Sequence, residues 1–424
     1  MKQKVVIIGG GIIGLSCAYY LRKNGLEVTV LEKDDFANAC SSGNQGWVCP
    51  ALHAPVPEPG LVATSIKWLM KKDSPLYIKP SAMPQLSGWL TQFMKHCNEE
   101  DFKAGERALL KLSLSTLALY DSLQADGLEF EMHREGMLFV FLSESELNHK
   151  IEKLRNNQKV YGHDTPIVLS GDEVRELEPD LSKRIVGGIL LENQRHVRPE
   201  SLAKALMNKL TSLGVQLRSN TEVTGIERQD DKILAVMCRQ ERIEADQFVL
   251  TAGAWSGSLA KQLGYSLPMQ AGKGYSITFS NPNVNISHPI YLGDSKAGVS
   301  PFQGAIRIGG TMELSGINTN LDKNRIQGIR QSVSKYLTDE LHGESEMEWT
   351  GMRPMTPDGL PVLGKIPYWN NAFVATGHGM VGVAMAPASG KIMADLICSG
   401  ETEFDIQSFS TSRFQKELKR NSPV

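Results

Sequence analysis

The opening of the chain consists of two short apolar runs separated by one amphipathic stretch. Val5–Ile8 is an apolar, mostly β-branched run, which is typical of a buried parallel strand. Residues 12–24 carry apolar side chains on one helical face, and Gly25 follows where a left-handed residue commonly ends a helix. A second apolar run, 28–31, ends at Glu32. This pattern predicts a strand, a tight turn, a helix and a second parallel strand.

Hydrophobic periodicity in the rest of the chain predicts a mixture of helices and strands. The proline-rich segment 50–59 excludes a regular helix there, and Ser170 is a candidate N-cap for a helix that follows it. We find no internal repeat. Helices are predicted at 61–72, 89–98, 106–125, 144–160, 198–213, 321–337 and 381–397. Strands are predicted at 136–142, 167–169, 185–191, 215–217, 221–227, 233–238, 248–250, 268–279, 305–309 and 372–376.

Three glycines in the first predicted turn have the spacing G-x-G-x-x-G. Gly9 permits the sharp turn, Gly11 lets a pyrophosphate approach the backbone, and Gly14 lets helix and strand pack closely. The helix N-terminus attracts phosphates, and Glu32 is placed to accept hydrogen bonds from ribose hydroxyls, which disfavours NADP. The context predicts a dinucleotide site rather than a ligand-free glycine turn, without distinguishing NAD from FAD.

Further polar and glycine-rich segments lie far from this turn. The small, polar loop 38–46 follows the second strand and suits contact with a flat polar ligand. Strands that end in glycines recur at 248–256 and 372–380. The segment 349–361, which is rich in glycine and proline, contains Arg353. Both later strands fit positions in the dinucleotide sheet, so the binding domain is expected to be discontinuous in sequence.

Composition limits the protein to ordinary globular classes. The chain has 424 residues, 41% hydrophobic and 22% charged, with a formal net charge of −2, which favours neither nucleic acid nor acidic lipid as partner. The six cysteines are scattered without metal-binding spacing, so we expect reduced thiols, no metal site and a cytosolic protein. No stretch has the apolar length of a membrane span, and glycines interrupt the only run that imitates a signal peptide.

Four motifs stand in a characteristic order: the 9–14 glycine turn with Glu32, Thr251–Ser256, Arg353–Gly359 and Thr376–Gly379. This order resembles the FAD-dependent amine oxidoreductases of the D-amino acid oxidase and glycine oxidase superfamily, over essentially the whole chain. Within it, segments 66–68, 353–359 and 376–379 are most similar to bacterial D-amino acid dehydrogenases.

The resemblance implies an α/β fold of two domains. The first is a Rossmann-like FAD-binding domain, discontinuous in sequence, formed by 1–50, 197–262 and 351–424. The second is an α+β substrate-binding domain with a mixed sheet, formed by 51–196 and 263–350.

The resemblance also implies site residues. Arg353 matches the arginine that pairs with the substrate carboxylate, and a planar guanidinium suits that role. His53, Tyr275 and His378 are candidates for substrate contacts, although a structural role is an equal alternative for each histidine. The predicted FAD-binding residues are Gly9, Gly11, Ile12, Ile13, Gly14, Glu32, Lys33, Ser41, Ser42, Asn44, Gly46, Val223, Thr251, Ala252, Gly253, Trp255, Gly377, His378, Gly379 and Met380.

The implied reaction is oxidation of the amine of a small D-amino acid, or a related secondary amino acid, to an imine and then a keto acid. Hydride would pass from the α-carbon to N5 of FAD. No cysteine stands near Gly351, where sarcosine-type relatives link their flavin, so non-covalent FAD is expected. Gln45 and Trp47 depart from the dehydrogenase pattern, and Trp47 and His53 are expected near the flavin or substrate, which leaves the substrate's identity open.

Several alternatives stay open at this point. One is a glycine, sarcosine or D-proline type amine oxidase that uses oxygen, and another is an NAD-dependent dehydrogenase. A third is a flavin-binding non-enzymatic or RNA-modification-associated module, against which the absence of a basic stripe argues. The expected partners are a small amino acid and a quinone or oxygen as electron acceptor. The expected location is cytoplasmic, with peripheral contact to the inner face of the plasma membrane if the acceptor is a quinone.

Overall fold

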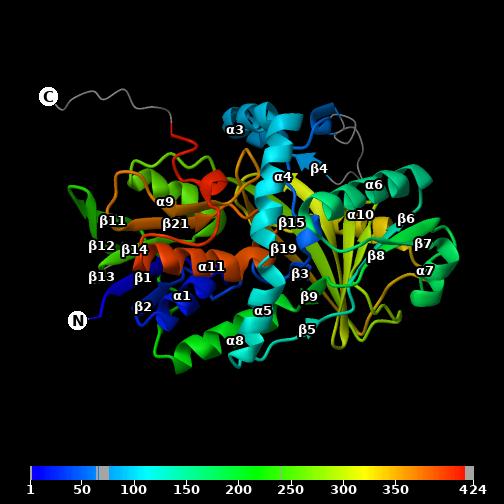
Figure 1. The fold of residues 1–424 in the computed structure, drawn as a ribbon, viewed down its shortest axis with the longest axis horizontal. Helices are drawn as coiled ribbons and strands as arrows, with labels where there is room; N and C mark the ends of the chain where they lie inside the picture. The colour runs from blue at the N-terminus through cyan, green and yellow to red at the C-terminus, as the bar shows by residue number, and fades with distance from the viewer. Residues whose placement is uncertain (1, 64, 66–75, 240, 416–424) are drawn as a thin grey trace.

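The structure is a computed structural model that describes residues 2–63, 65, 76–239 and 241–415. Most of the predicted 61–72 helix and the 66–68 segment therefore lie outside the described residues. Two large sheets dominate the fold, and helices α4 (Glu99–Ser113) and α5 (Thr116–Ala125) run between them in the view of Figure 1. Within the described residues, no helix combines the length and apolar character needed to cross a membrane.

The first sheet has six strands in the order β10-β2-β1-β14-β21-β20. All its pairings are parallel except that of β20 with β21. It joins chain segments more than 200 residues apart, because β1 lies between β2 and β14, as predicted for a discontinuous dinucleotide sheet. Its strands are β1 (Lys4–Ile8), β2 (Glu27–Leu31), β10 (Gln216–Arg218), β14 (Gln247–Leu250), β20 (Val362–Lys365) and β21 (Ala372–Thr376).

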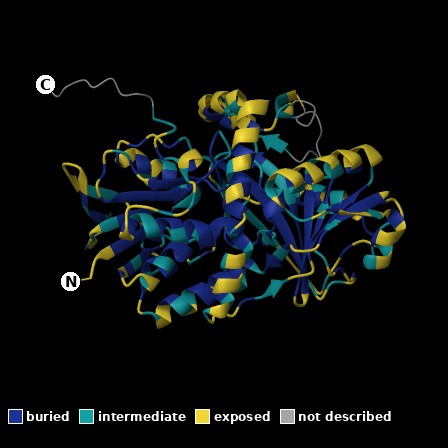
Figure 2. Ribbon diagram, viewed as in Figure 1, coloured by how far each residue is buried: buried dark blue, intermediate teal, exposed yellow. Residues whose placement is uncertain are grey.

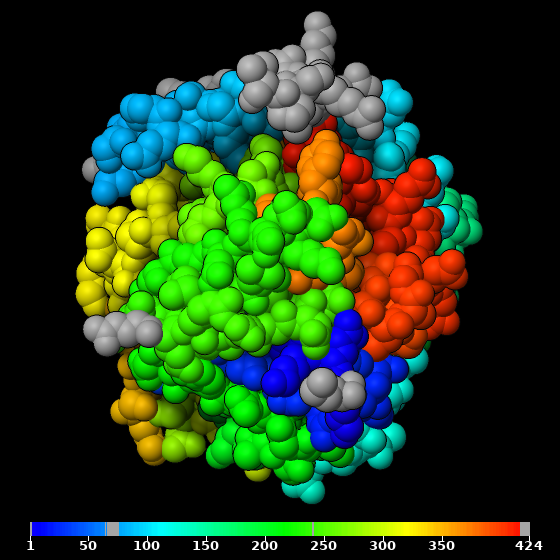
Figure 3. Space-filling model, turned by 90° about the vertical axis from the view of Figure 1, so that its left-hand side faces the viewer, coloured from blue at the N-terminus to red at the C-terminus, as the bar shows by residue number. Residues whose placement is uncertain are grey.

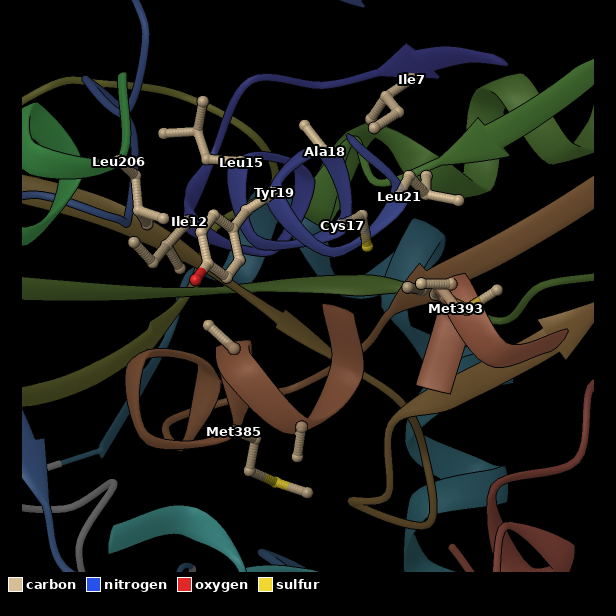
Figure 4. Close-up of a cluster of buried hydrophobic side chains, with 14 of the residues drawn as sticks. Ile7, Ile12, Leu15, Cys17, Ala18, Tyr19, Leu21, Leu206, Met385 and Met393 are labelled. Carbon is tan, nitrogen blue, oxygen red and sulfur yellow. The ribbon is translucent and has the colours of Figure 1, made fainter. Parts of the chain in front are cut away.

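Helices α1 (Ile12–Lys23), α8 (Pro199–Ser212) and α11 (Gly382–Cys398) cover one face of this sheet. Figure 4 shows the side chains of α1 and α11 meeting beside Ile7 of β1 and Leu206 of α8. The two helices cross closely at Gly390, where a Cβ would lie 2.6 Å from the backbone of Ser16. The three predicted helices are therefore confirmed: α8 buries one apolar face, whereas α1 and α11 are buried at most positions.

A three-stranded antiparallel sheet packs on the other side of the first sheet. It consists of β11 (Gly225–Gln229), β12 (Lys232–Cys238) and β13 (Glu241–Glu244), and it shares a buried apolar cluster with β1 and β14. Figure 3 shows this region at the end of the molecule, next to the N-terminal strand and the C-terminal segment. Helix α9 (Ser256–Gln262) follows β14 and packs into the same cluster.

The second sheet has nine strands, eight of them in the order β19-β15-β18-β17-β16-β6-β8-β7, with β4 added beside β18. It is mixed, since β16–β6 and β18–β4 are parallel and the other pairings are antiparallel. Its strands are β4 (Leu76–Ile78), β6 (Met137–Phe141), β7 (Ile167–Ser170), β8 (Gly187–Leu191), β15 (Gln270–Ser280), β16 (Ile290–Leu292), β17 (Ala297–Phe302), β18 (Ala305–Leu314) and β19 (Ser345–Met355).

Helices α6 (Glu144–Tyr161), α7 (Gly171–Leu177) and α10 (Lys323–Ser334) pack on this second sheet. Ser170 caps α7 as predicted, in a capping box with Glu173. Figure 2 shows buried strands at the centre of both halves and exposed faces on the outer helices. Strand β19 runs across residue 351, one of the predicted domain boundaries, and these boundaries stay predictions.

Two predicted helices differ from the structure. The 89–98 helix begins earlier, as α3 (Met83–His96), with a proline in its first turn. The single 106–125 helix is wrong, because α4 ends at Ser113 and α5 begins at Thr116. The hydroxyls of Ser113 and Ser115 donate back to Leu109 O (2.6 Å) and Leu112 O (3.0 Å), and such bonds compete with helix continuation.

A small fourth sheet connects the two halves. Its order is β3-β9-β5, with β3 (Trp47–Val48), β9 (Arg195–Val197) and β5 (Met132–His133). Strand β3 directly follows the polar loop 38–46, so this pairing anchors the end of that loop at the junction of the halves.

Candidate active site

A continuous cavity of about 750 Å³ extends between the two large sheets. One end is lined by the predicted dinucleotide residues, and the other by strands of the second sheet. The predicted residues that line it are Gly9, Gly11, Ile12, Ile13, Glu32, Lys33, Ser41, Asn44, Gly46, Val223, Thr251, Ala252, Gly253, Trp255, Tyr275, Arg353, His378, Gly379 and Met380. The fold therefore brings together segments that are scattered over the whole sequence.

The first glycine turn is built so that side chains cannot replace two of its glycines. Gly9 has a φ of +115°, and a Cβ there would lie 2.6 Å from Thr251 O. A Cβ at Gly14 would lie 2.0 Å from Gly9 O, so α1 approaches the strand more closely than any alanine would allow. Gly14 acts in packing rather than in lining, since it is not part of the cavity wall.

The N-terminus of α1 offers hydrogen-bond donors to the cavity. Ile12 N donates to Ser41 Oγ (2.8 Å) and Gly10 N donates to Glu32 Oε2 (2.7 Å). Among the described residues, the N–H groups of Gly11 and Ile13 have no protein acceptor. Unpaired N–H groups at the positive end of a helix dipole suit the phosphates of a dinucleotide.

The ribose and adenine end combines charge with flat apolar surface. Glu32 also accepts from Asp34 N (3.1 Å), so its carboxylate is held at the cavity edge. Lys33 Nζ lies 4.4 Å above the ring of Trp255, and both side chains line the cavity beside Val223. An aromatic face and a nearby carboxylate suit an adenosine.

Arg353 lies at the other end of the cavity without an acidic partner. Its Nη1 donates to Thr311 O (2.9 Å), and no carboxylate of the described residues forms an ion pair with it. Burial lowers the pKa of the Arg353 guanidinium to about 10, despite the opposing effect of the nearby Cys40. A buried cation with unused N–H groups is a site for a carboxylate ligand.

Glycines of the second sheet make the space that Arg353 occupies. A Cβ at Gly274 would lie 2.4 Å from the guanidinium carbon of Arg353. In the same way, a Cβ at Gly309 would lie 2.4 Å from Gln45 Nε2, and one at Gly298 would lie 2.6 Å from the ring of Trp47. The result is a glycine floor, defined here as Gly274, Gly298 and Gly309, on which these three larger side chains lie.

Several cavity residues that sequence reasoning did not assign come from this second sheet. Trp47, which was expected near the flavin or substrate, lines the cavity, and so does Gln45, which was noted only as a departure from a family pattern. Ser300 Oγ accepts from Trp47 Nε1 (2.8 Å) and lies 2.7 Å from Gln45 Oε1, which fixes both side chains. Glycines inside predicted strands were the available signal. Other lining side chains that were not assigned include Cys40, Tyr291, Lys296 and Trp349.

The hydroxyl of Tyr275 is already used in a bond within the protein. The hydroxyl donates to Glu313 Oε2 (2.7 Å), and the ring packs in the apolar cluster behind the sheet. Lys273 Nζ lies 3.6 Å from Glu313 Oε1, so the three form one buried network. Tyr275 reaches the cavity wall, but its polar atom is already bound to another protein group.

The two candidate histidines occupy different places. His378 lines the cavity, and its Nε2 lies 2.8 Å from Ser389 Oγ. His53 is not part of the cavity wall and pairs instead with Ser113 of α4 through Nδ1. Burial lowers the pKa of both imidazoles to about 3, so both are neutral at ordinary pH. The structure thus brings only one of the two to the site.

Two predicted FAD-binding residues also lie behind the wall. Ser42 directs its hydroxyl to Ala39 O (3.2 Å). Gly377 has a φ of +80° and turns the chain between β21 and His378 without lining the cavity. Gly379 N donates to Pro354 O (2.9 Å), which joins the 376–380 turn to the segment after Arg353.

Comparison with known proteins agrees with this geometry. Residues 4–396 match the family described as FAD dependent oxidoreductase (DAO). A D-amino acid dehydrogenase of Helicobacter pylori is 32% identical over 413 residues, covering 97% of this chain and 99% of the relative. A D-amino acid dehydrogenase of Vibrio atlanticus is 32% identical over 422 residues, covering 97% of this chain and all of the relative (100%).

Solved structures show the same fold. Glycine oxidase from Geobacillus kaustophilus matches with a TM-score of 0.79 and 22% identity, covering 98% of this chain and 100% of its own. L-proline dehydrogenase from P. horikoshii matches with a TM-score of 0.75 and 20% identity, covering 97% and 98%. The cradle of glycines, the free helix donors and the length of the cavity all fit FAD. The chain belongs to the family of FAD-dependent oxidoreductases and is an FAD-dependent enzyme.

Proposed function

We propose that this enzyme oxidises the α-amine of a small D-amino acid and holds the substrate's carboxylate at Arg353. The observation that carries the proposal is the partly buried guanidinium of Arg353, which faces the cavity without an acidic partner among the described residues. The relatives named D-amino acid dehydrogenases, 32% identical over nearly full length, support the D-configuration and the substrate class.

The side chains at this end bind and orient rather than transfer protons. Bound FAD supplies the two-electron acceptor. Arg353 fixes the carboxylate by paired hydrogen bonds, which leaves the α-carbon in one orientation. His378 is neutral and bonded to Ser389, so the substrate amine must lose its proton to water before oxidation. The imine product then hydrolyses in water to a keto acid, or persists if it is cyclic.

The cofactor is held by backbone and packing contacts in this proposal. Position 351 is glycine and carries no thiol that could link to FAD. The only cysteine among the described residues that line the cavity is Cys40, whose pKa is raised by burial, which disfavours its thiolate. Denaturation in acid should therefore release all of the flavin into solution, and flavin that remained with the precipitated protein would contradict non-covalent binding.

Replacement of Arg353 tests the proposal. In Arg353→Leu the apparent Kd for the amino acid, measured from anaerobic flavin bleaching, should rise at least about 100-fold, because a charge-assisted bidentate contact is lost. Arg353→Lys should recover part of this loss, because lysine keeps the positive charge but lacks the bidentate hydrogen bonding of a guanidinium. Arg330→Leu, which removes a surface ion pair with Glu346, is the matched control. Unchanged substrate affinity in Arg353→Leu would refute the assignment.

The electron acceptor is a separate part of the proposal. The relatives are named dehydrogenases, which supports an acceptor other than oxygen, such as a quinone. A quinone would bring the enzyme into peripheral contact with a membrane. Stopped-flow re-oxidation of the reduced enzyme should be at least about tenfold faster with a soluble quinone than with air-saturated buffer. Faster re-oxidation by oxygen would make the enzyme an amine oxidase instead.

A further inference from the structure

The loop 43–46 has all four of its backbone carbonyls bound by other segments. Three of the donors are side chains on adjacent strands β15, β18 and β17 of the second sheet, and the fourth is the backbone of β9. The contacts are Ser276 Oγ to Gly43 O (2.6 Å), Arg307 Nη1 to Asn44 O (2.8 Å), Ser300 Oγ to Gln45 O (2.8 Å) and Val197 N to Gly46 O (2.8 Å).

This arrangement determines where the loop's N–H groups point. In a planar trans peptide, the N–H of one residue points opposite to the carbonyl of the residue before it. The N–H groups of Asn44 and Gln45 therefore point away from Ser276 and Arg307. Neither has a protein acceptor among the described residues, and both residues line the cavity. Two adjacent donors are thus left for whatever occupies the cavity.

The other end of the loop is fixed to the dinucleotide half. Ser41 Oγ accepts from Ile12 N at the start of α1, and Asn44 Oδ1 accepts from Gly46 N (2.9 Å). The segment 41–46 therefore connects the first turn of α1 to the second sheet. A displacement of either attachment changes the position of the two free donors.

One ion pair, buried at its arginine, holds the centre of this connection. Arg307 is 1% exposed, and its Nη2 lies 2.9 Å from Glu200 Oε1 of α8. Glu200 Oε1 also accepts from Gly43 N (2.8 Å), and Arg307 Nε donates to Thr278 Oγ1 (2.8 Å). Burial alone would raise the pKa of Glu200, but Arg307 and the Gly43 N–H together hold that pKa below its usual value.

We propose that Arg307 and Glu200 are positioning residues, which hold the loop 43–46 so that the N–H groups of Asn44 and Gln45 face bound FAD and substrate. They touch neither ligand themselves. The inference rests on the proposed function only for its substrate, since the loop and its free donors are features of the cavity itself. Its consequence is that one pair of side chains couples the docking of α8 on the second sheet to alignment in the site.

Hydrogen exchange of the segment 40–48, with and without FAD, tests the positioning directly. FAD should slow exchange of this segment in the wild type. In Arg307→Met the FAD-induced protection should fall about tenfold, the factor expected for the loss of about one hydrogen bond to a charged group. Glu200→Gln, which keeps an acceptor for Gly43 N, should lose less. Arg330→Met is the matched control, because its ion pair with Glu346 lies away from the cavity. Equal protection in wild type and Arg307→Met would overturn the proposal.

The rate of flavin reduction separates positioning from simple loss of stability. In the purified Arg307→Met holoenzyme, the limiting rate constant for reduction by the amino acid should fall at least about tenfold. The Kd of a non-reactive carboxylate should stay within about threefold, because Arg353 is intact. Partial unfolding would lower the amount of holoenzyme without changing this rate constant. An unchanged rate constant would also refute the proposal.

Two precautions keep these outcomes decisive. If Arg307→Met does not fold, Ser276→Ala removes the Gly43 carbonyl contact without leaving a buried charge, and the same loss of protection is expected. If no amino acid reduces the wild-type flavin, the proposed function fails, whereas the exchange experiment still decides the role of Arg307.

Discussion

The two ends of the cavity both depend on glycine, for opposite reasons. At the dinucleotide end, Gly9 and Gly14 bring backbone close to backbone, and the donors offered to the ligand are N–H groups of α1. At the substrate end, Gly274 and the rest of the glycine floor make room for side chains, and the donor is the guanidinium of Arg353. The first end is designed around the main chain, and the second around side chains from distant segments.

This difference separates two kinds of binding. A backbone cradle recognises a group that all dinucleotides share, so it requires little from individual side chains. A side chain that lies over glycines can be exchanged without altering the strands beneath it. We therefore expect substitutions at the two ends to act independently. Substitutions at the first end should weaken FAD binding, and substitutions at the second end should weaken substrate binding.

The largest effect is expected for Gly14→Ala. The new Cβ would lie 2.0 Å from Gly9 O, which cannot move without opening the turn. Overpacking of this kind costs about 1–3 kcal/mol of stability, and the FAD Kd should rise about 100-fold, as measured by quenching of flavin fluorescence. Gly328→Ala in α10, where nothing lies within 4 Å of the new Cβ, is the control and should stabilise slightly. Tight FAD binding by Gly14→Ala would contradict the packing argument.

Gly274→Ala is the counterpart at the substrate end. Its Cβ would lie 2.4 Å from the guanidinium carbon of Arg353 and push that side chain aside. We expect the Kd for a carboxylate ligand to rise about 30-fold, from flavin difference spectra, while the FAD Kd changes less than about threefold. Parallel losses of FAD and carboxylate affinity would show that the two ends are not independent.

A smaller effect is expected for Glu32→Gln. The carboxylate accepts from Gly10 N and Asp34 N, so the amide keeps the geometry in part but loses the charge. The FAD Kd should rise about tenfold, since hydrogen bonds to a charged acceptor are stronger than those to a neutral one. The Kd of the carboxylate ligand, measured on FAD-saturated enzyme, should not change. A change confined to carboxylate binding would reverse the assignment of the two ends.

The smallest effect on flavin reduction is expected for His378, the histidine on the cavity wall. Its pKa in the folded protein is about 3, against a usual value of 6.5, because burial disfavours the charged ring. Between these pH values the unfolded state binds the extra proton, so stability falls as pH falls, by at most about 1.4 kcal/mol per pH unit. His378→Asn should reduce this slope in chemical denaturation. It should leave the pH profile of flavin reduction above pH 6 unshifted, and a shift would make His378 a proton carrier.

Most residues predicted for the dinucleotide end line the cavity, because the information for this end is local, and their contacts with FAD stay predictions. Strand, turn, helix and Glu32 lie within one βαβ unit, and each glycine has a mechanical reason that needs no distant partner. The later turns at Thr251 and Gly379 were placed correctly beside it, since glycine-ended strands fit the same sheet edge.

At the other end, the sequence predicted Arg353, which lines the cavity, and its role as carboxylate anchor stays a proposal. The glycine floor depends on the register of β15, β17 and β18, which no single segment contains. His53 was chosen for its chemistry, but the break between α4 and α5 brings Ser113 to it and keeps it behind the wall. Likewise, the side chain of Tyr275 points to the far side of its strand, where its hydroxyl donates to Glu313. The places of these residues are determined by tertiary contacts between distant segments and not by residue type.

In the proposed reaction, an amino acid held by Arg353 reduces FAD at this cavity. Anaerobic mixing of the holoenzyme with the D- and L-forms of small amino acids, followed by the visible flavin band, tests it most directly. We expect bleaching by at least one D-amino acid, little or none by its L-form, and an at least 100-fold higher half-saturating concentration in Arg353→Leu. Equal bleaching by both enantiomers, or an unchanged half-saturating concentration in Arg353→Leu, would contradict it.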